Sequence, residues 1–328
     1  MNAPSPNARA PRSPQIKRPK HKINGWINLD KPLDMTSTQA VGAVKHLLAP
    51  EKIGHAGTLD PLATGVLPLA LGEATKTVQY MMDSMKIYRF TVCFGTQTTT
   101  DDREGAPMNH SDVRPDDAAI AAVLPHFEGT ISQVPPVYSA IKIAGERAYD
   151  LARAGEHVVL QPRSVYIARC SLIERLNADE VVLEVECGKG TYVRSLARDL
   201  AAMLGSCGHV SALRRTKVGR FHVDHAISLD DLPNYAISDV YASIDAWLEP
   251  IECALDDIPA VTLDATQAQR LRHGNSCFVP PSAFARHAGY IQEDGHELYQ
   301  AYHAGRLIAL VLREDRVVFP LRQFNLNH

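Results

Sequence analysis

The chain has 328 residues, enough for one large domain with a small one or for two medium domains. Its formal net charge is −3, so it is not basic as a whole, and any nucleic acid must be held by local basic patches. The cysteines are scattered without a Cys-x-x-Cys pair, which argues against a zinc site and a disulfide framework. The chain has no apolar run of about 18 residues and no signal-peptide core, which argues against a membrane span. Together these features predict a cytoplasmic protein.

The first 22 residues are rich in proline, serine and alanine and carry basic side chains without an acid. This composition predicts a disordered basic tail over residues 1–22. A solvated terminus is the ordinary interpretation of such a tail, and a weak RNA contact is the sharper one.

Residues 23–252 mix strands and helices without βαβ regularity, which predicts an α+β domain around a largely antiparallel sheet. Thr36 or Ser37 caps a helix with Val41, Val44, Leu47 and Leu48 on its apolar face. Residues 96–112 are polar and loop-like. The predicted strands are 25–29, 66–71, 86–95, 164–172, 181–187 and 210–223. The other predicted helices are 74–82, a helix that begins at Asp116 or Asp117 and is stopped by Gly129, the segment 149–154, and a helix with Leu196, Leu200, Met203 and Leu204 inward.

The sequence pattern changes near the C-terminus, where short apolar runs alternate with glycine-containing turns. This pattern predicts a compact β-rich domain over residues 253–328. The connection before it, 229–250, has no clear periodicity.

One stretch stands out: residues 54–68 read GHAGTLDPLATGVLP and hold a single carboxylate, Asp60. Glycines permit positive φ and close backbone approach to a ligand, and Pro61 restricts the chain just after the acid. Asp-Pro is also an ordinary turn dipeptide, so the loop alone favours a plain turn over a catalytic one.

Three other kinds of site were weighed. The histidines are dispersed with no H-E-x-x-H pattern, which argues against a metal site. Gly188-Lys189-Gly190-Thr191 hints at a phosphate-cradling loop, but it lacks both the P-loop spacing and the third Rossmann glycine. No nucleophile elbow marks a catalytic serine or cysteine.

The loop 54–68, with the trailing GEATK at 72–76, resembles the signature of the TruB family of tRNA pseudouridine synthases. Further segments are similar to other motifs of that family, in the same order along the chain. They are DKP at 30–32 with Thr36-Ser37, YRF at 88–90, QVPPVYSAIK at 133–142 (the RNA-gripping thumb loop), GTYVR at 190–194 and SALRRT at 211–216. One departure is Asp34, where the first motif usually has glycine.

The resemblance implies a pseudouridine synthase fold with a PUA-like RNA-binding C-terminal domain, and a catalytic role for Asp60. It implies that Tyr88 stacks on a flipped base, that Arg194 pairs with the carboxylate and that Tyr192 lies beside it. From the residues alone, Tyr88 is a core side chain on an alternating strand, and Arg194 is a surface helix arginine.

The resemblance further implies that His55 contacts RNA or replaces the flipped base and that Leu213 lines a hydrophobic pocket. The predicted phosphate contacts are Lys31, Lys142, Arg214, Arg215 and Lys217. Charged segments are usually solvated faces, so binding is assigned to this set of cations as a whole.

The resemblance implies an isomerase that converts uridine 55 of the tRNA T-loop to pseudouridine without cofactor or metal, and we expect it to act as a monomer. The main alternative is a tRNA-binding folding chaperone in which catalysis is secondary. A nucleotide-dependent enzyme built on 188–191 is a third, weaker hypothesis.

Overall fold

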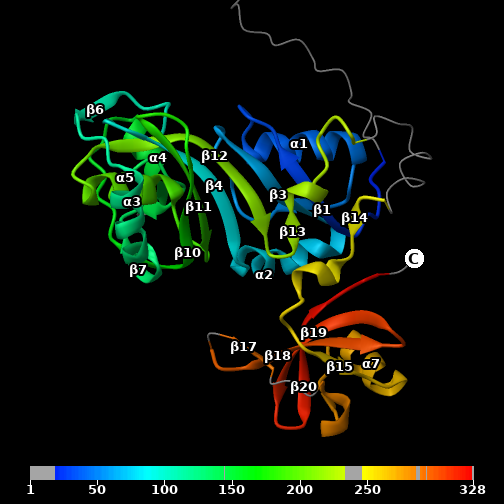
Figure 1. Cartoon of the computed structure of the whole chain (residues 1–328). Coiled ribbons are helices and arrows are strands. Elements are labelled where there is room, and N and C mark those ends of the chain that lie inside the picture. Colours follow the sequence, from blue (N-terminus) through cyan, green and yellow to red (C-terminus); the bar gives the residue numbers. More distant parts are fainter. Residues whose placement is uncertain (1–18, 144, 233–245, 286–288, 293, 327–328) are drawn as a thin grey trace, which may run out of the picture.

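The computed structural model describes residues 19–143, 145–232, 246–285, 289–292 and 294–326. Up to residue 249 the chain folds around a ten-stranded sheet, and the C-terminal part folds around a separate six-stranded sheet (Figure 1). The predicted tail lies almost wholly outside the described residues. At its end, the His21 N–H already donates to the Ala49 carbonyl at 2.9 Å, so ordered contacts are present by residue 21.

The large sheet is mostly antiparallel, and among its paired strands in the described chain only β3 and β12 run parallel. Helices cover it, which confirms the predicted α+β class. In spatial order the strands are β14 (Leu248–Glu249), β1 (Gly25–Lys31), β3 (Ala63–Leu71), β12 (Gly208–Val218), β4 (Lys86–Phe94), β11 (Glu180–Cys187), β10 (Arg163–Arg175) and β7 (Gly129–Gln133), while β2 (Ile53–His55) pairs with β3 and β13 (Phe221–His222) pairs with β12.

Helix α1 (Ser37–Leu48) packs on β1 and β3. Thr36 is its N-cap and forms a capping box with Gln39: the Thr36 hydroxyl accepts from the Gln39 N–H at 3.1 Å, and the Gln39 side chain accepts from the Thr36 N–H at 2.8 Å. Val44 and Leu48 are buried as predicted. The buried stripe places the first turn of α1 beside the connection between β2 and β3.

Helix α5 (Val193–Met203) covers β4, β11 and β12 with Leu196 and Leu200 inward, as predicted. Met203 is predicted inward as well, but its side chain is 51% exposed. The buried face runs along Val193, Ala197 and Leu200, and Met203 lies at its edge in the last turn. The shorter helices are η1 (Gly72–Thr77), α2 (Val78–Asp83), α3 (Asp117–Val123), η2 (Leu124–Phe127), α4 (Ala148–Arg153) and η3 (Val223–His225).

The polar segment 96–112 is more ordered than the sequence predicts. It contains a hairpin of β5 (Thr96–Thr98) and β6 (Pro107–His110), and it carries Asp101 and Asp102, both buried. The sequence did not predict a strand here, because β6 is exposed along its whole length and its residues do not alternate between apolar and polar. The carboxylates of Asp101 and Asp102 point inward and pair with arginines of α5.

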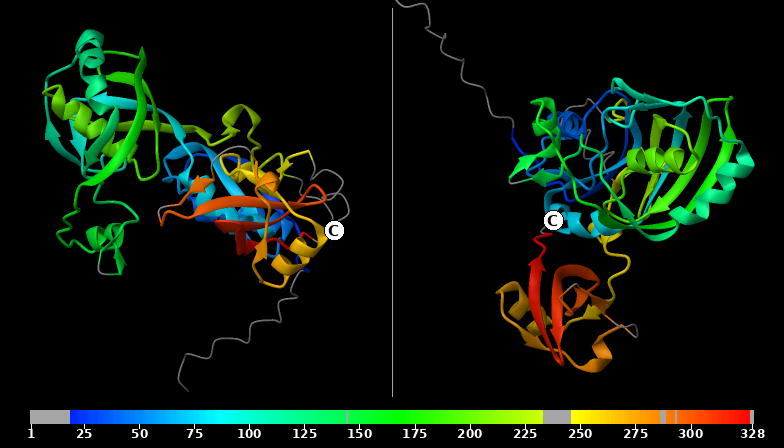
Figure 2. Two further views of the ribbon diagram at one scale, coloured as in Figure 1. Left: turned by 90° about the horizontal axis from the view of Figure 1, so that it is seen from below. Right: turned by 90° about the vertical axis from the view of Figure 1, so that its left-hand side faces the viewer.

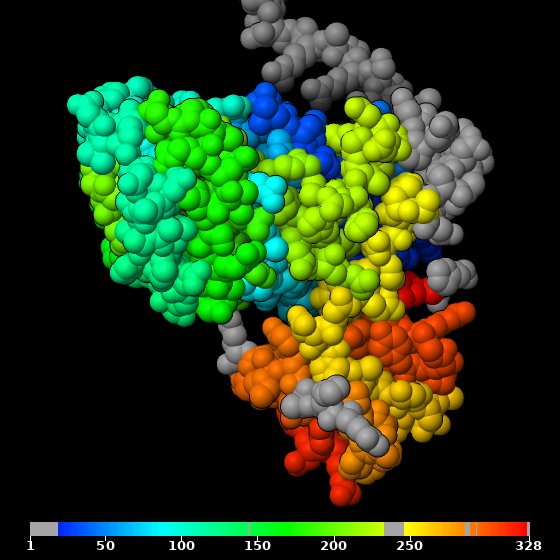
Figure 3. All heavy atoms as spheres, in the orientation of Figure 1, coloured from blue at the N-terminus to red at the C-terminus, as the bar shows by residue number. Residues whose placement is uncertain are grey.

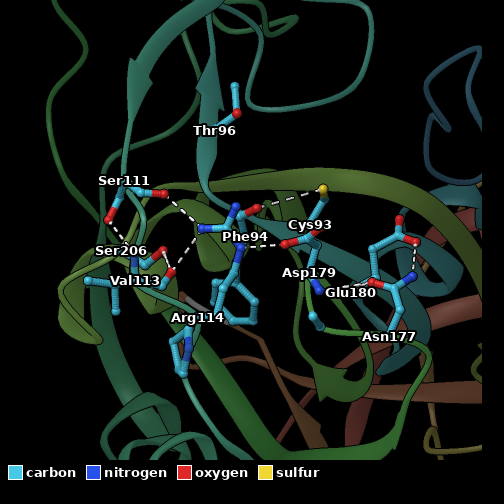
Figure 4. A network of polar contacts seen from close by, with 12 residues as sticks. Cys93, Phe94, Thr96, Ser111, Val113, Arg114, Asn177, Asp179, Glu180 and Ser206 are labelled. Atoms are coloured by element: carbon cyan, nitrogen blue, oxygen red, sulfur yellow. Dashed lines mark hydrogen bonds and ion pairs between the residues drawn. The ribbon is translucent and has the colours of Figure 1, made fainter.

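Arg114 holds the end of this segment in place (Figure 4). Its guanidinium pairs with Asp179 and donates to the Ser111 carbonyl at 2.7 Å. Gly95 lies against the same guanidinium, with φ +100°, and a Cβ there would stand 2.3 Å from Arg114 Nη2. Only glycine fits at that position.

The segment after β7 leaves the body of the molecule, as the left view of Figure 2 shows. It includes a small hairpin of β8 (Lys142–Ile143) and β9 (Glu146–Arg147), followed by α4. It contains most of the segment 133–142 that resembles the thumb loop of the family.

The C-terminal domain follows η4 (Ile251–Ala254), which contains the predicted boundary at residue 253. It packs directly against the larger unit (Figure 3), and the buried core between them includes Trp26, Val218, Leu298 and Leu310. Its elements are β15 (Ala260–Thr262), α7 (Ala265–Arg272), β16 (Cys277–Phe278), η5 (Pro281–Ala283), β17 (Tyr290–Ile291), β18 (Glu297–His303), β19 (Arg306–Glu314) and β20 (Val317–Gln323).

Candidate active site

The connection between β2 and β3 presents Asp60, whose side chain is 43% exposed. The start of α1 fixes the residue before it: Ser37 Oγ accepts from the Leu59 N–H at 2.9 Å and donates to the Leu59 carbonyl at 3.0 Å. On the other side, the Asp34 N–H donates to the Pro61 carbonyl at 3.0 Å. The carboxylate is therefore carried on backbone that is anchored both before and after it.

Lys31 supports the same loop from inside. Its side chain is fully buried, and its ammonium donates to the carbonyls of Pro32 at 2.8 Å and Met35 at 2.7 Å. Burial lowers its pKa to about 8. The prediction that Lys31 contacts phosphate is therefore wrong, because its ammonium donates its hydrogen bonds to backbone carbonyls in the interior.

Arg194 lies at the second position of α5 and is the cation that faces Asp60. Its Nη2 is 2.9 Å from Asp60 Oδ2 and also donates to the Tyr138 carbonyl at 2.9 Å. Its Nη1 donates to the Thr100 carbonyl at 2.9 Å and lies 3.6 Å from Asp102 Oδ2. Only 7% of this side chain is exposed, so it is not the surface helix arginine that the residues alone suggest.

Asp60 and Arg194 line a cleft with a volume of about 310 Å³. Tyr88, Tyr192 and Leu213 give it aromatic and aliphatic walls. Burial raises the pKa of both phenols, so both hydroxyls keep their protons at neutral pH. A flat aromatic ring can enter between these walls and approach the one carboxylate that lines the cleft among the described residues.

Arg215 is predicted to contact phosphate, and this prediction is also wrong, because its side chain is 1% exposed. Its guanidinium donates to the Val66 carbonyl at 2.7 Å and to the Gly57 carbonyl at 2.9 Å, and it lies 6.0 Å from the centre of the Tyr88 ring. Gly65, with φ +102°, pairs with the same residue, and a Cβ there would stand 2.1 Å from the Arg215 carbonyl oxygen. Glycine at 65 thus serves packing within the loop rather than approach to a ligand.

The remaining predicted residues do not line the cleft and differ in exposure. His55 is partly buried within the signature loop, and burial, with Arg215, lowers its pKa, which favours the neutral ring. Arg214 is partly neutralised by a two-point ion pair with Asp30, whose shorter contact is 2.6 Å. Lys142 is exposed on the protruding segment, and Lys217 is partly exposed on β12.

Several side chains help to build the site in ways that the sequence did not predict. Ser37, expected only as a helix cap, holds Leu59, while Asp102 faces Arg194 and the Gln133 side chain contacts the backbone of Tyr192. Ser139 lines the cleft with a buried hydroxyl that lies beside the Tyr192 phenol. No local pattern marks Asp102, because an Asp pair in a threonine-rich loop is typical of a turn; Gln133 lay inside a matched motif without an assigned role.

Among the residues that the structure describes, no group of three or more histidine, cysteine or acidic side chains is arranged to hold a metal ion. Within the same ranges, none of the helices combines the length and the apolar character that a membrane crossing requires.

Comparison with known proteins assigns this sheet and cleft to the RNA pseudouridine synthases. The chain aligns with a Cbf5–Nop10–Gar1 complex at a TM-score of 0.66 and 30% identity, covering 88% of this chain and 78% of the other. It aligns with an H/ACA RNP bound to a substrate RNA containing 2′-deoxyuridine at a TM-score of 0.67 and 27% identity, covering 92% and 84%.

Sequence comparison specifies the family. The family models described as TruB family pseudouridylate synthase (N terminal domain) and tRNA pseudouridylate synthase B C-terminal domain match residues 45–193 and 194–256. A tRNA pseudouridine synthase B of Bradyrhizobium diazoefficiens is 48% identical over 326 residues, 98% of this chain and 91% of the relative. One of Caulobacter sp. strain K31 is 49% identical over 304 residues, 93% and 97%. The chain belongs to the TruB family, and the resemblance predicted from its motifs is confirmed.

Proposed function

We propose that this pseudouridine synthase acts on tRNA and isomerises uridine 55 in the T-loop, with Asp60 as the catalytic group. One observation carries the assignment: Asp60 is the carboxylate that reaches the cleft between Tyr88 and Leu213, and Arg194 holds it from behind. The names of the relatives, tRNA pseudouridine synthase B, support tRNA as the substrate. The chaperone alternative is not favoured, because all the parts of a catalytic site are present together.

The reaction breaks the N1–C1′ bond of uridine and forms a C5–C1′ bond, while a proton leaves C5 and another is taken up at N1. Nothing is oxidised and no group is imported. Asp60 acts either as the nucleophile or as the base that removes a ribose proton. The paired arginine fixes the orientation of the carboxylate for either role.

The substrate base must leave its stack to reach Asp60, at a cost of a few kcal/mol. Stacking against Tyr88 offsets about 1–3 kcal/mol of that cost. Leu213 and Tyr192 line the pocket. We assign His55, in the signature loop, to contacts with the RNA outside the pocket. Lys142 and Lys217 are the cations that we assign to phosphate contacts, with a smaller part for the ion-paired Arg214.

We further propose that the C-terminal domain is PUA-like and that it adds RNA contacts outside the cleft. Phe278 is 57% exposed there, beside Arg270. An exposed aromatic next to a cation suits a base or a sugar of the tRNA. A monomeric, cytoplasmic enzyme is part of the same proposal.

The decisive experiment compares the unchanged protein with Asp60→Asn on a T-stem-loop transcript with a single target uridine. We expect Asp60→Asn to bind the RNA with unchanged affinity and to form no pseudouridine, because an amide can neither attack nor accept the proton. Normal turnover by Asp60→Asn would overturn the assignment. Phe278→Ser tests the C-terminal domain and should weaken binding of full-length tRNA more than binding of the stem-loop.

A further inference from the structure

Gln133 makes an unusual contact with a residue of the active site. Its side-chain amide holds the backbone of Tyr192 at two points: Oε1 accepts from the Tyr192 N–H at 2.8 Å, and Nε2 donates to the Tyr192 carbonyl at 3.2 Å. Gln133 is 2% exposed and is the last residue of β7, at the edge of the large sheet. The amide therefore ties Tyr192 to the rigid sheet across 59 positions of sequence.

Tyr192 needs such support. It is the N-cap of α5, but its own side chain makes no capping hydrogen bond, so the helix start is not fixed locally. The preceding residues form a turn with Gly190 at φ +82°, and Arg194 follows Tyr192 by two positions, in the first turn of the helix. Without Gln133, the backbone between the turn and the catalytic arginine would lose its only side-chain anchor among the described residues.

The same junction also fixes the protruding segment that begins after Gln133. Ser195 Oγ donates to the Val134 carbonyl at 2.8 Å, Arg198 Nη2 donates to it at 2.9 Å, and Arg194 Nη2 donates to the Tyr138 carbonyl at 2.9 Å. The start of α5 and the start of the segment are thus joined by direct hydrogen bonds. Arg194 takes part in this junction and in the pair with Asp60 at the same time.

We propose that Gln133 is a positioning residue for the isomerisation: it holds Tyr192 at the wall of the cleft and, through the start of α5, keeps Arg194 in register with Asp60. The inference rests on the proposed function. Gln133 itself does not line the cleft, so it acts through Tyr192. Misplacement of a reacting group by about 1 Å can cost about 100-fold in rate, which sets the size of the expected effect.

The test is the substitution Gln133→Met, which keeps the length of the side chain and removes both hydrogen bonds. Single-turnover conversion of the T-stem-loop transcript at saturating protein is measured together with the affinity for the RNA. We expect the rate constant to fall about 10- to 100-fold, while the dissociation constant stays within about threefold.

The matched control is Gln300→Met in the C-terminal domain. Gln300 is also a buried glutamine, 8% exposed, whose amide donates to the Leu255 and Ile258 carbonyls at 3.0 and 2.6 Å. It should lose stability to a similar degree and keep the wild-type rate constant. A rate constant of Gln133→Met within threefold of wild type would overturn the inference, as would an equal loss in both variants.

A double-mutant cycle separates positioning from general stability. Tyr192→Ala keeps the backbone that Gln133 holds and removes only the phenol ring, so in that background Gln133→Met should still cost what it loses through Arg194, but less than it costs in the wild type. Equal losses in both backgrounds would contradict the inference. Activity of the unchanged protein is measured first, because its absence would overturn the proposed function, whereas normal activity with an unaffected Gln133→Met overturns the inference alone.

Discussion

Arg194 Nη2 lies 2.9 Å from Asp60 Oδ2, and the two partners differ sharply in exposure: the arginine side chain is 7% exposed and the carboxylate side chain 43%. The guanidinium also donates to the Thr100 and Tyr138 carbonyls, so backbone on two other segments fixes it. The pair therefore consists of a cation held in the protein and an anion turned to the cleft. Asp60 is free to meet a substrate without losing its partner.

Replacing Arg194 should affect both stability and rate. Arg194→Met leaves the buried Asp102 without the cation that lies 3.6 Å away, and we expect a loss of about 3–5 kcal/mol in the free energy of unfolding. The rate constant at saturating RNA should fall about 100- to 1,000-fold, because the charge facing Asp60 is lost. Urea unfolding and single-turnover assays measure the two effects.

Arg175→Met is the control for this prediction. Arg175 pairs with Asp117 at 2.7 Å and donates to the Pro115 carbonyl at 2.7 Å, with no lining position in the cleft. It should lower stability and spare the rate constant. A wild-type rate constant for a folded Arg194→Met would contradict the role of the pair.

Substitutions of Arg215 and of the lysines Lys142 and Lys217 should differ in their effect on the salt dependence of RNA binding. Arg215→Met removes the donors to the buried Gly57 and Val66 carbonyls, so we expect about 2–4 kcal/mol lower stability and an unchanged slope of log K against log salt. Lys142→Ala and Lys217→Ala should each reduce that slope by roughly one unit and leave stability unchanged. A reduced slope for Arg215→Met would restore it as a phosphate contact.

Lys31 should make the stability of the protein depend on alkaline pH. Its pKa is lowered from 10.5 to about 8 by burial, so below pH 8 the folded and unfolded chains both hold the proton and the cost of burying the charge is fully present. Between pH 8 and 10.5 the folded chain releases the proton while the unfolded chain keeps it, so stability rises with pH. The gain is on the order of 3 kcal/mol.

The measurement is urea unfolding at about pH 7, 9 and 10.5 for wild type and Lys31→Met. The wild type should gain stability relative to the variant across that range. Lys86, whose burial also lowers its pKa to about 8, is present in both proteins and cancels. Lys45→Met, at an exposed position of α1, is the control and should follow the wild type; parallel profiles for wild type and Lys31→Met would contradict the prediction.

Asp34 tests the one departure from the family motif. Its φ is +59°, in the left-handed region that glycine adopts without penalty. We therefore expect Asp34→Gly to be more stable than Asp34→Ala by about 1 kcal/mol in urea unfolding. The reverse order would show that the side chain at 34, rather than its backbone conformation, decides the stability of this turn.

The sequence alone determined the periodic elements and the family. The cap at Thr36, the buried stripe of α1, the strand that carries Tyr88 and the placement of Asp60 in a turn all follow from local patterns, because caps, turns and amphipathic faces depend on residues a few positions apart. The family followed from several ordered motifs, which are far more specific than any one of them.

Only the tertiary structure decided which charges are available. Three cations in matched motifs differ in this respect. Lys31 and Arg215 donate hydrogen bonds to internal carbonyls, whereas Lys142 faces solvent. Burial is a property of segments that meet from distant parts of the chain, so composition cannot reveal it. The same reason hid Asp102 and Gln133, whose partners Arg194 and Tyr192 lie far away in sequence and meet them only across the folded sheet.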